Sequence, residues 1–314
     1  MAGGKKLLTI FGATGNQGGS IIDVVLASPD LSAKYALRGI TRDRTSAKSQ
    51  ALASQGVDMV QADLNDVGSL QKAMEGAYGA FGVTDFWAVM SKEVEFSQGR
   101  NVFAAAKAAG VRHYVWSSLP WAEKLTGGVL RHVDHFDSKA MVEEYVEANK
   151  GEMVASYYMP AMFLTMTKTL VKAVHGTPML SVPFPSDSVA WPLVDVRGDG
   201  GKYVIGLFEA GEEANGAKVN AVSTWTTPKE VVATLSKAAG KEVVYNPVSA
   251  EVFGGFFPEA IRAELVETLR LVGEYSYYGK GAEKEQAEQD RWLVAGATKT
   301  SLEQWVAENG PWTF

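Results

Sequence analysis

Three glycines near the start of the chain have the spacing of a loop that holds a phosphate group. They are Gly12, Gly15 and Gly18, and they follow the short apolar run from Leu7 to Phe11. A strand, a glycine turn and a helix form the setting in which a loop binds the pyrophosphate of a dinucleotide. Free backbone N–H groups at a helix start and the helix dipole both favour an anion. The alternative is a tight turn that binds no ligand.

Each glycine has a specific expected role in such a loop. Gly12 permits the tight turn out of the strand, and Gly15 lets the backbone approach the pyrophosphate without a Cβ in the way. Gly18 or Gly19 lets the helix pack close to the sheet. We expect the helix itself to run from Ser20 to Ala27.

The residues after the expected second strand, Tyr35 to Thr41, distinguish between two dinucleotides. An NAD site usually has an acidic residue here for the ribose 2′-hydroxyl, whereas the 2′-phosphate of NADP requires a cation. The first residue past the strand is Arg42, whose guanidinium can hold a phosphate through two hydrogen bonds. We therefore favour NADP(H). The alternative is that Arg42 and Arg44 are solvated and Asp43 binds a plain ribose.

Lys139 and His135 are one turn apart in a helix expected to begin near Asp134, so they share a face with Val142 and Val146. A lysine in line with an apolar stripe either points into the protein or reaches solvent along its methylene stem. The spacing does not choose between these two positions. His135 could donate a proton near neutral pH, because its unperturbed pKa is about 6.5. Both residues are therefore catalytic candidates.

Strands and helices alternate through the first half of the chain. The expected strands cover residues 7–11, 35–41, 57–64 with the following turn, 79–84, 112–118 and 153–159. This alternation predicts βαβ units, right-handed connections and a parallel sheet whose ligands lie beyond the C-terminal strand ends. Asp63 and Leu64 follow the third strand there, and Thr84 to Phe86 follow the fourth. An alternative role for Asp63 is to cap the helix expected over 67–74.

The regular alternation ends near Phe163, where prolines become frequent. We expect strands over 189–196, 218–223 and 243–245, and helices over 228–239, 258–271 and 301–306. The predicted fold class is therefore α/β. It consists of a Rossmann-type doubly wound parallel sheet in residues 1–160 and a smaller α/β C-terminal lobe in 161–314. This lobe is expected to bind the substrate or a partner and to cross back to the sheet.

Composition excludes several classes of function. The chain has 314 residues, a net charge of −6, no Cys and only four His without an H-E-x-x-H pair. The charge argues against direct nucleic-acid binding, and the missing ligands argue against a metal site. No apolar stretch reaches the roughly 18 residues of a membrane helix, and the first strand starts too early for a signal peptide. We expect a cytoplasmic location, with the nucleus also compatible.

Three segments together resemble the NmrA-like family, a branch of the atypical short-chain dehydrogenase/reductase group. They are the glycine loop 12–20, the segment 83–87, and 135–139 with 142–145. The resemblance covers nearly the whole chain and is strongest over residues 7–150. It implies a Rossmann domain, a smaller C-terminal part and an NADP(H) cleft between them.

The resemblance also implies cofactor roles for particular residues. The pyrophosphate loop matches Gly12, Ala13, Thr14, Gly15, Asn16 and Gln17. The 2′-phosphate ligand matches Arg42, the adenine-side loop matches Asp63 and Leu64, and the ribose-side loop matches Thr84, Asp85 and Phe86. The lysine near the nicotinamide ribose matches Lys139, and the loop beside the nicotinamide matches Pro160 to Phe163.

The standard Ser-Tyr-Lys triad of short-chain dehydrogenases is incomplete. His135 occupies the Tyr position and Leu119 the Ser position, although Ser117 and Ser118 are adjacent. An intact cofactor site beside a degraded triad favours an NADP(H)-binding redox sensor or regulator that acts on a protein partner.

The second hypothesis is an NADPH-dependent reductase of a carbonyl, imine or conjugated double bond. It would use Lys139, His135 or both to transfer the proton. An aromatic set could surround its organic substrate, and core packing is the alternative role for at least half of this set. The set comprises Trp87, Trp121, Phe163, Tyr275, Tyr277 and Tyr278.

Overall fold

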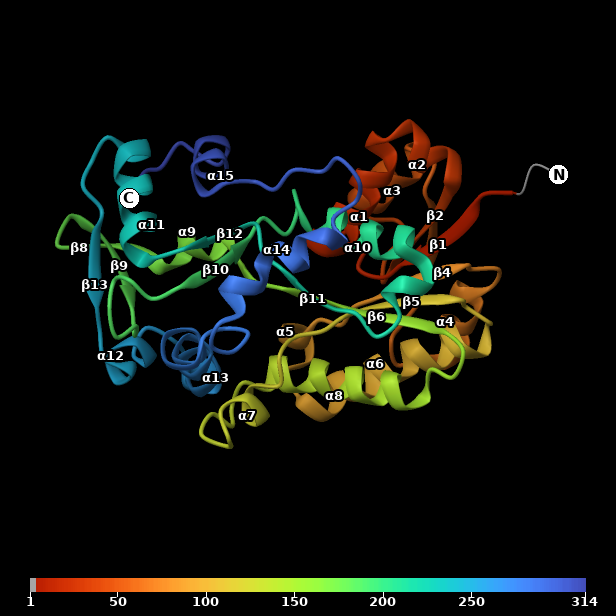
Figure 1. Ribbon diagram of the computed structural model, residues 1–314, viewed down its shortest axis with the longest axis horizontal. Coiled ribbons are helices and arrows are strands. Elements are labelled where there is room, and N and C mark those ends of the chain that lie inside the picture. The colour runs from red at the N-terminus through yellow and green to blue at the C-terminus, as the bar shows by residue number, and fades with distance from the viewer. Residues whose placement is uncertain (1–3) are drawn as a thin grey trace.

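A seven-stranded parallel sheet forms the centre of the computed structural model, which describes residues 4–314 (Figure 1). Its strands are β1 (Lys6–Ile10), β2 (Tyr35–Thr41), β3 (Asp58–Gln61), β4 (Gly79–Gly82), β5 (His113–Ser117), β6 (Val154–Pro160) and β11 (Lys218–Ala221). They lie in the order β11-β6-β5-β4-β1-β2-β3, and every pair is parallel. Along the sheet, the strand numbers increase in one direction from β1 to β3 and in the opposite direction from β4 to β6. This change between β1 and β4 confirms the predicted Rossmann-type fold.

Helices cover both faces of the sheet (Figure 1). They are α1 (Asn16–Ala27), α2 (Pro29–Lys34), α3 (Ala47–Ser54), α4 (Val67–Met74), α6 (Lys92–Ala108), α8 (Asp134–Asn149) and α10 (Gly200–Ala210). The helices α1 and α10 pack together in one apolar cluster with β1, and α4, α6 and α8 pack in another. Two short helices, α5 (Phe86–Val89) and α7 (Ala122–Leu125), lie near the strand ends.

Strand β2 and helix α4 have the predicted bounds. The predicted start of α1 was wrong, because the helix begins at Asn16 and not at Ser20. Helix α10 was not predicted. A Cβ on Gly201 of α10 would lie 2.3 Å from the Ser20 carbonyl oxygen, and the Gly201 N–H donates to Ser20 Oγ at 2.7 Å. Glycines lower helix propensity in isolation, but here they allow two helices to approach closely.

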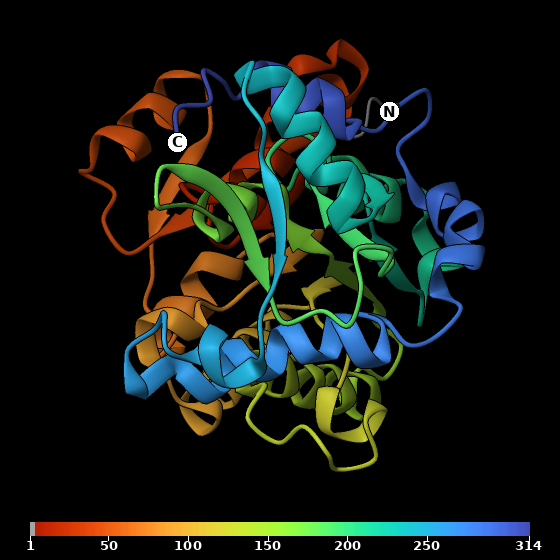
Figure 2. The same cartoon turned by 90° about the vertical axis from the view of Figure 1, so that its left-hand side faces the viewer.

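The chain from residue 161 contributes two small sheets. One contains β12 (Thr224–Thr226), β10 (Trp191–Val194) and β7 (Met162–Phe163), and the other β13 (Val244–Pro247), β9 (Thr177–Val182) and β8 (Val171–Val174). The β8–β9 hairpin was not predicted. The helices here are α9 (Thr167–Leu170), α11 (Pro228–Ala239), α12 (Ala250–Gly254), α13 (Glu259–Arg270), α14 (Gln286–Gln289) and α15 (Leu302–Glu308). Figure 2 shows α13, in blue, between these small sheets and the yellow-green α8.

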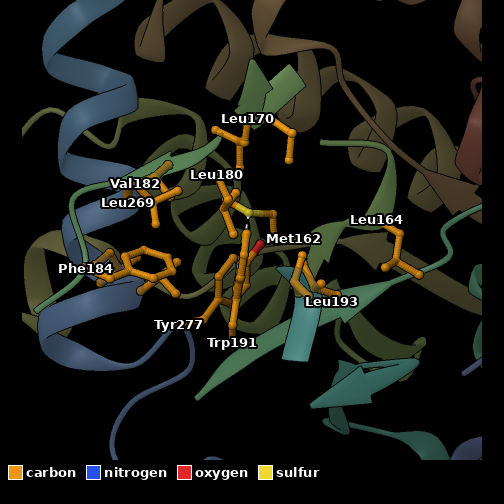
Figure 3. Packing of buried hydrophobic residues seen from close by; sticks show 14 of the residues in the cluster. Met162, Leu164, Leu170, Leu180, Val182, Phe184, Trp191, Leu193, Leu269 and Tyr277 are labelled. Carbon is orange, nitrogen blue, oxygen red and sulfur yellow. Dashed lines mark hydrogen bonds between the residues drawn. The ribbon is translucent and has the colours of Figure 1, made fainter. Parts of the chain in front are cut away.

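The small sheets and α13 share a core centred on Trp191 (Figure 3). The indole N–H of Trp191 donates to the Met162 sulfur at 3.2 Å, and Phe184 packs edge-on against its ring at 5.3 Å. Leu269 and Tyr277 belong to the same cluster. This core gives the region around Met162 a rigid backing, because closely packed side chains leave little room to move.

None of the helices between residues 4 and 314 is both long enough and apolar enough to span a bilayer.

Candidate functional site

One cavity of about 1000 Å³ lies beyond the C-terminal ends of the sheet strands. Loops that follow β1, β2, β3, β4, β5 and β6 line it, together with part of α13. All the predicted cofactor and catalytic residues line this cavity except Ala13. The Ala13 N–H donates to the Ile40 carbonyl at 3.3 Å, and its methyl group is buried beside Gly39. Ala13 therefore packs the loop against β2.

The glycine loop has the shape of an anion-binding loop. Gly12 has φ +63°, a left-handed conformation that glycine adopts at no steric cost. A Cβ on Gly18 would lie 2.4 Å from the Gly12 carbonyl oxygen, so the start of α1 packs directly onto the turn. Asn16 and Gln17 line the cavity in the first turn of α1, where helical N–H groups have no partner within the helix. The loop thus fits a pyrophosphate.

A side chain from the second half of the chain braces this loop. The Arg197 Nη1 donates to the Gly15 carbonyl at 3.2 Å, and Nη2 pairs with Asp23 at 2.5 Å. The Arg197 guanidinium lies where a Cβ on Gly19 would be, 1.5 Å from its Nη1. Of the two glycines predicted to let the helix pack close to the sheet, Gly18 makes that contact, whereas Gly19 makes room for an arginine. Sequence reasoning missed Arg197, because it lies 182 residues from Gly15 along the chain.

The loop after β2 presents positive charge to the cavity. Arg42, Ser46 and Lys48 all line it. The neighbouring Asp43 also lines the cavity, but its Oδ1 accepts from the N–H and the hydroxyl of Thr45 at 2.8 and 2.6 Å. These hydrogen bonds hold the Asp43 pKa below its usual value. Asp43 thus organises its own turn, and the groups with free donors are Arg42 and Lys48.

Asp63 and Leu64 line the cavity after β3, but Asp63 does not cap the next helix. The cap of α4 is Asp66, whose Oδ1 accepts from the N–H groups of Gly68 and Ser69. Asp63 instead accepts from the Asn65 N–H at 2.9 Å. The alternative prediction, in which Asp63 caps α4, was therefore wrong.

Lys139 points into the protein and not to solvent. It is 7% exposed, and its ammonium pairs with Glu95 of α6, a carboxylate with no solvent exposure. The Lys139 Nζ also lies 3.4 Å from the Thr84 hydroxyl, and Ser138 donates a second hydrogen bond to Glu95. A buried charge needs such a partner. Of the two predicted positions for Lys139, the one that points into the protein is confirmed. Its partner there is a carboxylate.

His135 is held by a carboxylate from the other part of the chain. Its Nδ1 pairs with Glu264 of α13, and Glu264 also accepts from the backbone N–H groups of Asp134 and His135 at 3.1 Å. One turn along α13, Glu267 binds the ring and the N–H of His132 at 2.7 Å. This hydrogen bond raises the His132 pKa. The two glutamates of α13 thus fix the start of α8.

The two serines next to the Ser position of the incomplete triad have different surroundings. Ser117 lines the cavity and donates to the Gln17 side-chain carbonyl at 2.7 Å. Ser118 is buried elsewhere and donates to Glu143 at 2.5 Å. Glu143 is itself buried and pairs with Lys218 at 2.6 Å. Leu119 lines the cavity at the predicted Ser position.

The predicted aromatic set divides into two halves. Trp87, Phe163 and Tyr277 line the cavity, whereas Trp121, Tyr275 and Tyr278 pack elsewhere. Tyr278, for example, donates to the Met159 carbonyl at 2.8 Å and lies edge-on to Tyr277. Tyr275, Tyr277 and Tyr278 pack in the core around Trp191, so core packing accounts for half of the set, whereas Trp121 has the Lys124 ammonium over its ring.

Comparison with known proteins agrees with the geometry. The model of the NmrA-like family matches residues 4–306. The NmrA-like family domain-containing oxidoreductase himF of Aspergillus japonicus is 31% identical, covering 90% of this chain and 88% of its own. The corresponding oxidoreductase hkm9 of Aspergillus hancockii is 30% identical, covering 87% and 85%.

Solved structures show the same fold at lower identity. The structure of NmrA, a negative transcriptional regulator, in complex with NAD has a TM-score of 0.81 at 22% identity, over 98% of this chain and 96% of that one. The NADPH-dependent quinone oxidoreductase QOR2 of Escherichia coli, solved with NADPH, has a TM-score of 0.74 at 22% identity, over 96% and 99%. Because the family model matches nearly its whole length, this chain belongs to the NmrA-like family.

Proposed function

We propose that this chain binds NADP(H) and reduces a carbonyl, imine or conjugated double bond of an organic substrate. One observation carries the proposal. A single cavity joins the glycine loop and Arg42, on the β2–β3 side of the sheet, to Lys139, His135 and apolar residues of the C-terminal part. A cofactor loop that continues into a substrate-sized space is the arrangement of an oxidoreductase.

The cation-rich turn after β2 supports NADP(H) as the cofactor. Arg42 and Lys48 would hold the 2′-phosphate, while Oδ1 of Asp43 already accepts two hydrogen bonds from Thr45. The solved complexes of NmrA with NADP and of QOR2 with NADPH support the same assignment. NADPH, when bound, would supply the hydride.

The residues Lys139 and His135 would manage the proton and the orientation of the substrate. The Lys139 ammonium, fixed by Glu95 beside Thr84, can donate to a ribose hydroxyl or to the substrate oxygen. The Nδ1 of His135 is engaged by Glu264, which leaves Nε2 to exchange a proton with the substrate. Each group is thus held in place by a carboxylate behind it, as proton transfer in a fixed geometry requires.

An NADP(H) sensor is the second candidate, and the missing Tyr and Ser of the standard triad favour it. Sequence considerations alone rank the sensor first. Two findings reverse that order: the apolar continuation of the cavity, and the curated relatives named as oxidoreductases. A sensor needs no space beyond the nicotinamide.

The test is a titration followed by a turnover assay. Calorimetry with NADPH, NADP, NADH and NAD should show much tighter binding of the phosphorylated pair. Oxidation of NADPH should then be observed with members of a carbonyl and imine panel, and it should be lost in Lys139→Met and His135→Phe. Binding without oxidation by any compound would favour the sensor. Absence of binding by all four dinucleotides would overturn both candidates.

A further inference from the structure

We infer that the substrate is an uncharged, flat, conjugated carbonyl compound that lies against Trp87, an inference that rests on the proposed function. Three features of the substrate side of the cavity lead to it: the pairing of its charges, its apolar wall and its exposed tryptophan.

The basic side chains on this side of the cavity are already paired. Lys139 is paired with Glu95, and His135 with Glu264, and both carboxylates are buried. Neither side chain is therefore free to pair with a substrate carboxylate, because each already has a buried carboxylate as its partner. Asp85, an exposed carboxylate that does not cap the helix it precedes, also lines the cavity and repels anions. An anionic substrate is disfavoured on both counts.

Another part of the cavity lining, formed by α13 and the segment after β6, offers a ligand few polar groups. Met162, Met166, Leu265 and Leu269 line it. The Tyr277 hydroxyl donates to the Pro160 carbonyl at 3.0 Å, so its proton is already used within the protein. Burying a charged or highly polar substrate against such a wall would cost desolvation free energy that no hydrogen bond repays.

The wall is also backed by packed side chains. Thr268 turns its hydroxyl to the Glu264 carbonyl of its own helix at 2.6 Å. Figure 3 shows Met162, Leu269 and Tyr277 within the core around Trp191. The wall is thus a rigid apolar surface, which selects ligands by shape.

Trp87 supplies a flat surface beside His135. Its side chain is 45% exposed although it lines the cavity, whereas its neighbour Phe86 is buried and anchors α5. The Trp87 ring lies 5.3 Å from that of His135, at an angle of 44°. A flat conjugated ligand covering this indole would remove apolar surface from water and stack beside the candidate proton donor.

The chemistry balances for a ketone. A ketone, NADPH and one proton give a secondary alcohol and NADP⁺. The proton reaches the carbonyl oxygen from His135 Nε2 or from the Lys139 ammonium, and solvent restores it.

The experiment measures binding, so that it does not depend on turnover. Protein saturated with NADP⁺, which cannot reduce a ketone, is titrated calorimetrically with four probes. Three share one skeleton: 2-acetylnaphthalene, the anion 6-acetyl-2-naphthoate and the cation 6-acetyl-2-naphthyltrimethylammonium. The fourth, cyclohexyl methyl ketone, is neutral but not flat. The preceding NADP⁺ titration shows separately whether the proposed cofactor site exists.

We expect 2-acetylnaphthalene to bind at least about tenfold more tightly than each of the other three. Trp87→Ala should weaken it about tenfold, and Trp87→Phe should retain most of the affinity because a ring remains. Phe256→Ala is the matched control, because Phe256 is 56% exposed and lies away from the cavity. Equal or tighter binding of either charged probe or of the saturated ketone would overturn the inference, as would unchanged affinity in Trp87→Ala.

Discussion

The two sides of the cavity are built in different ways. On the glycine-loop side, the groups proposed to meet the dinucleotide come from short continuous segments, 12–18 and 42–48, and many of them belong to the backbone. On the Lys139 side, each candidate side chain depends on a carboxylate from a distant element, Glu95 of α6 or Glu264 of α13. A local motif can form a phosphate site by itself, whereas a buried cation requires a partner that the fold must bring to it.

The largest effect should come from breaking the buried pair on the Lys139 side. Lys139→Met leaves Glu95, which has no solvent exposure, without its cation. We expect the free energy of unfolding to fall by about 3–5 kcal/mol, measured by urea denaturation. The double variant Lys139→Met/Glu95→Gln should recover most of this loss, because a neutral amide can still accept from Ser138. A double variant as unstable as the single one would contradict the pairing.

A second test uses pH, because the same side contains a buried acid. Asp137 in the first turn of α8 accepts from the Glu123 N–H, and burial raises its pKa to about 6. The folded state then binds more protons than the unfolded state between about pH 4 and 6, so stability falls as pH rises through this window. The two-unit shift corresponds to about 3 kcal/mol.

The variant Asp137→Asn isolates this contribution. Its amide oxygen can keep the hydrogen bond from Glu123 but cannot ionise. From pH 4 to 6, the wild type should therefore lose up to about 3 kcal/mol of unfolding free energy relative to the variant. Parallel stability curves over this range would show that Asp137 does not titrate there.

On the glycine-loop side, charge should act on affinity and not on stability. Arg42→Ala should weaken NADPH binding about 10- to 100-fold, since a hydrogen bond to a charged group contributes about 1.5–3 kcal/mol. NADH binding should change less than about twofold. Arg44→Ala is the control, because Arg44 is equally exposed but does not line the cavity. If both variants lose the same amount of affinity for NADPH, the general positive charge of the loop, and not Arg42 itself, is responsible for that affinity.

The smallest effect concerns the contact of the glycine loop with Arg197. A methyl group in Gly19→Ala would occupy the position of the Arg197 guanidinium and displace it from the Gly15 carbonyl. We expect Gly19→Ala and Arg197→Ala each to weaken NADPH binding about three- to tenfold. The double variant should be no worse than either, because both changes remove the same contact. Additive losses in calorimetry would assign the two residues separate roles.

Much of the fold could be predicted from local patterns. The strands and helices up to residue 160 alternate clearly. Helix α11 has its predicted bounds, with strong local signals: a Thr227 cap, Pro228 at its first position and Gly240 at its end. The elements that were missed, α10 and the β8–β9 hairpin, lack such signals: α10 opens with two glycines, and the hairpin contains a Pro. Contacts with α1 and with the Trp191 core stabilise them instead.

For the site, the sequence by itself determined the loop residues that form the cavity, because strand ends in a parallel sheet meet at one edge. It also predicted Arg42, which lines the cavity just after β2, as the candidate ligand of a 2′-phosphate. Only the tertiary structure decided that Lys139 is buried and that Glu95, Glu264 and Arg197 hold the site together. A charge pair between distant elements leaves no periodic pattern in the chain. Its partners become recognisable when folding removes water from both and leaves each only the other to pair with.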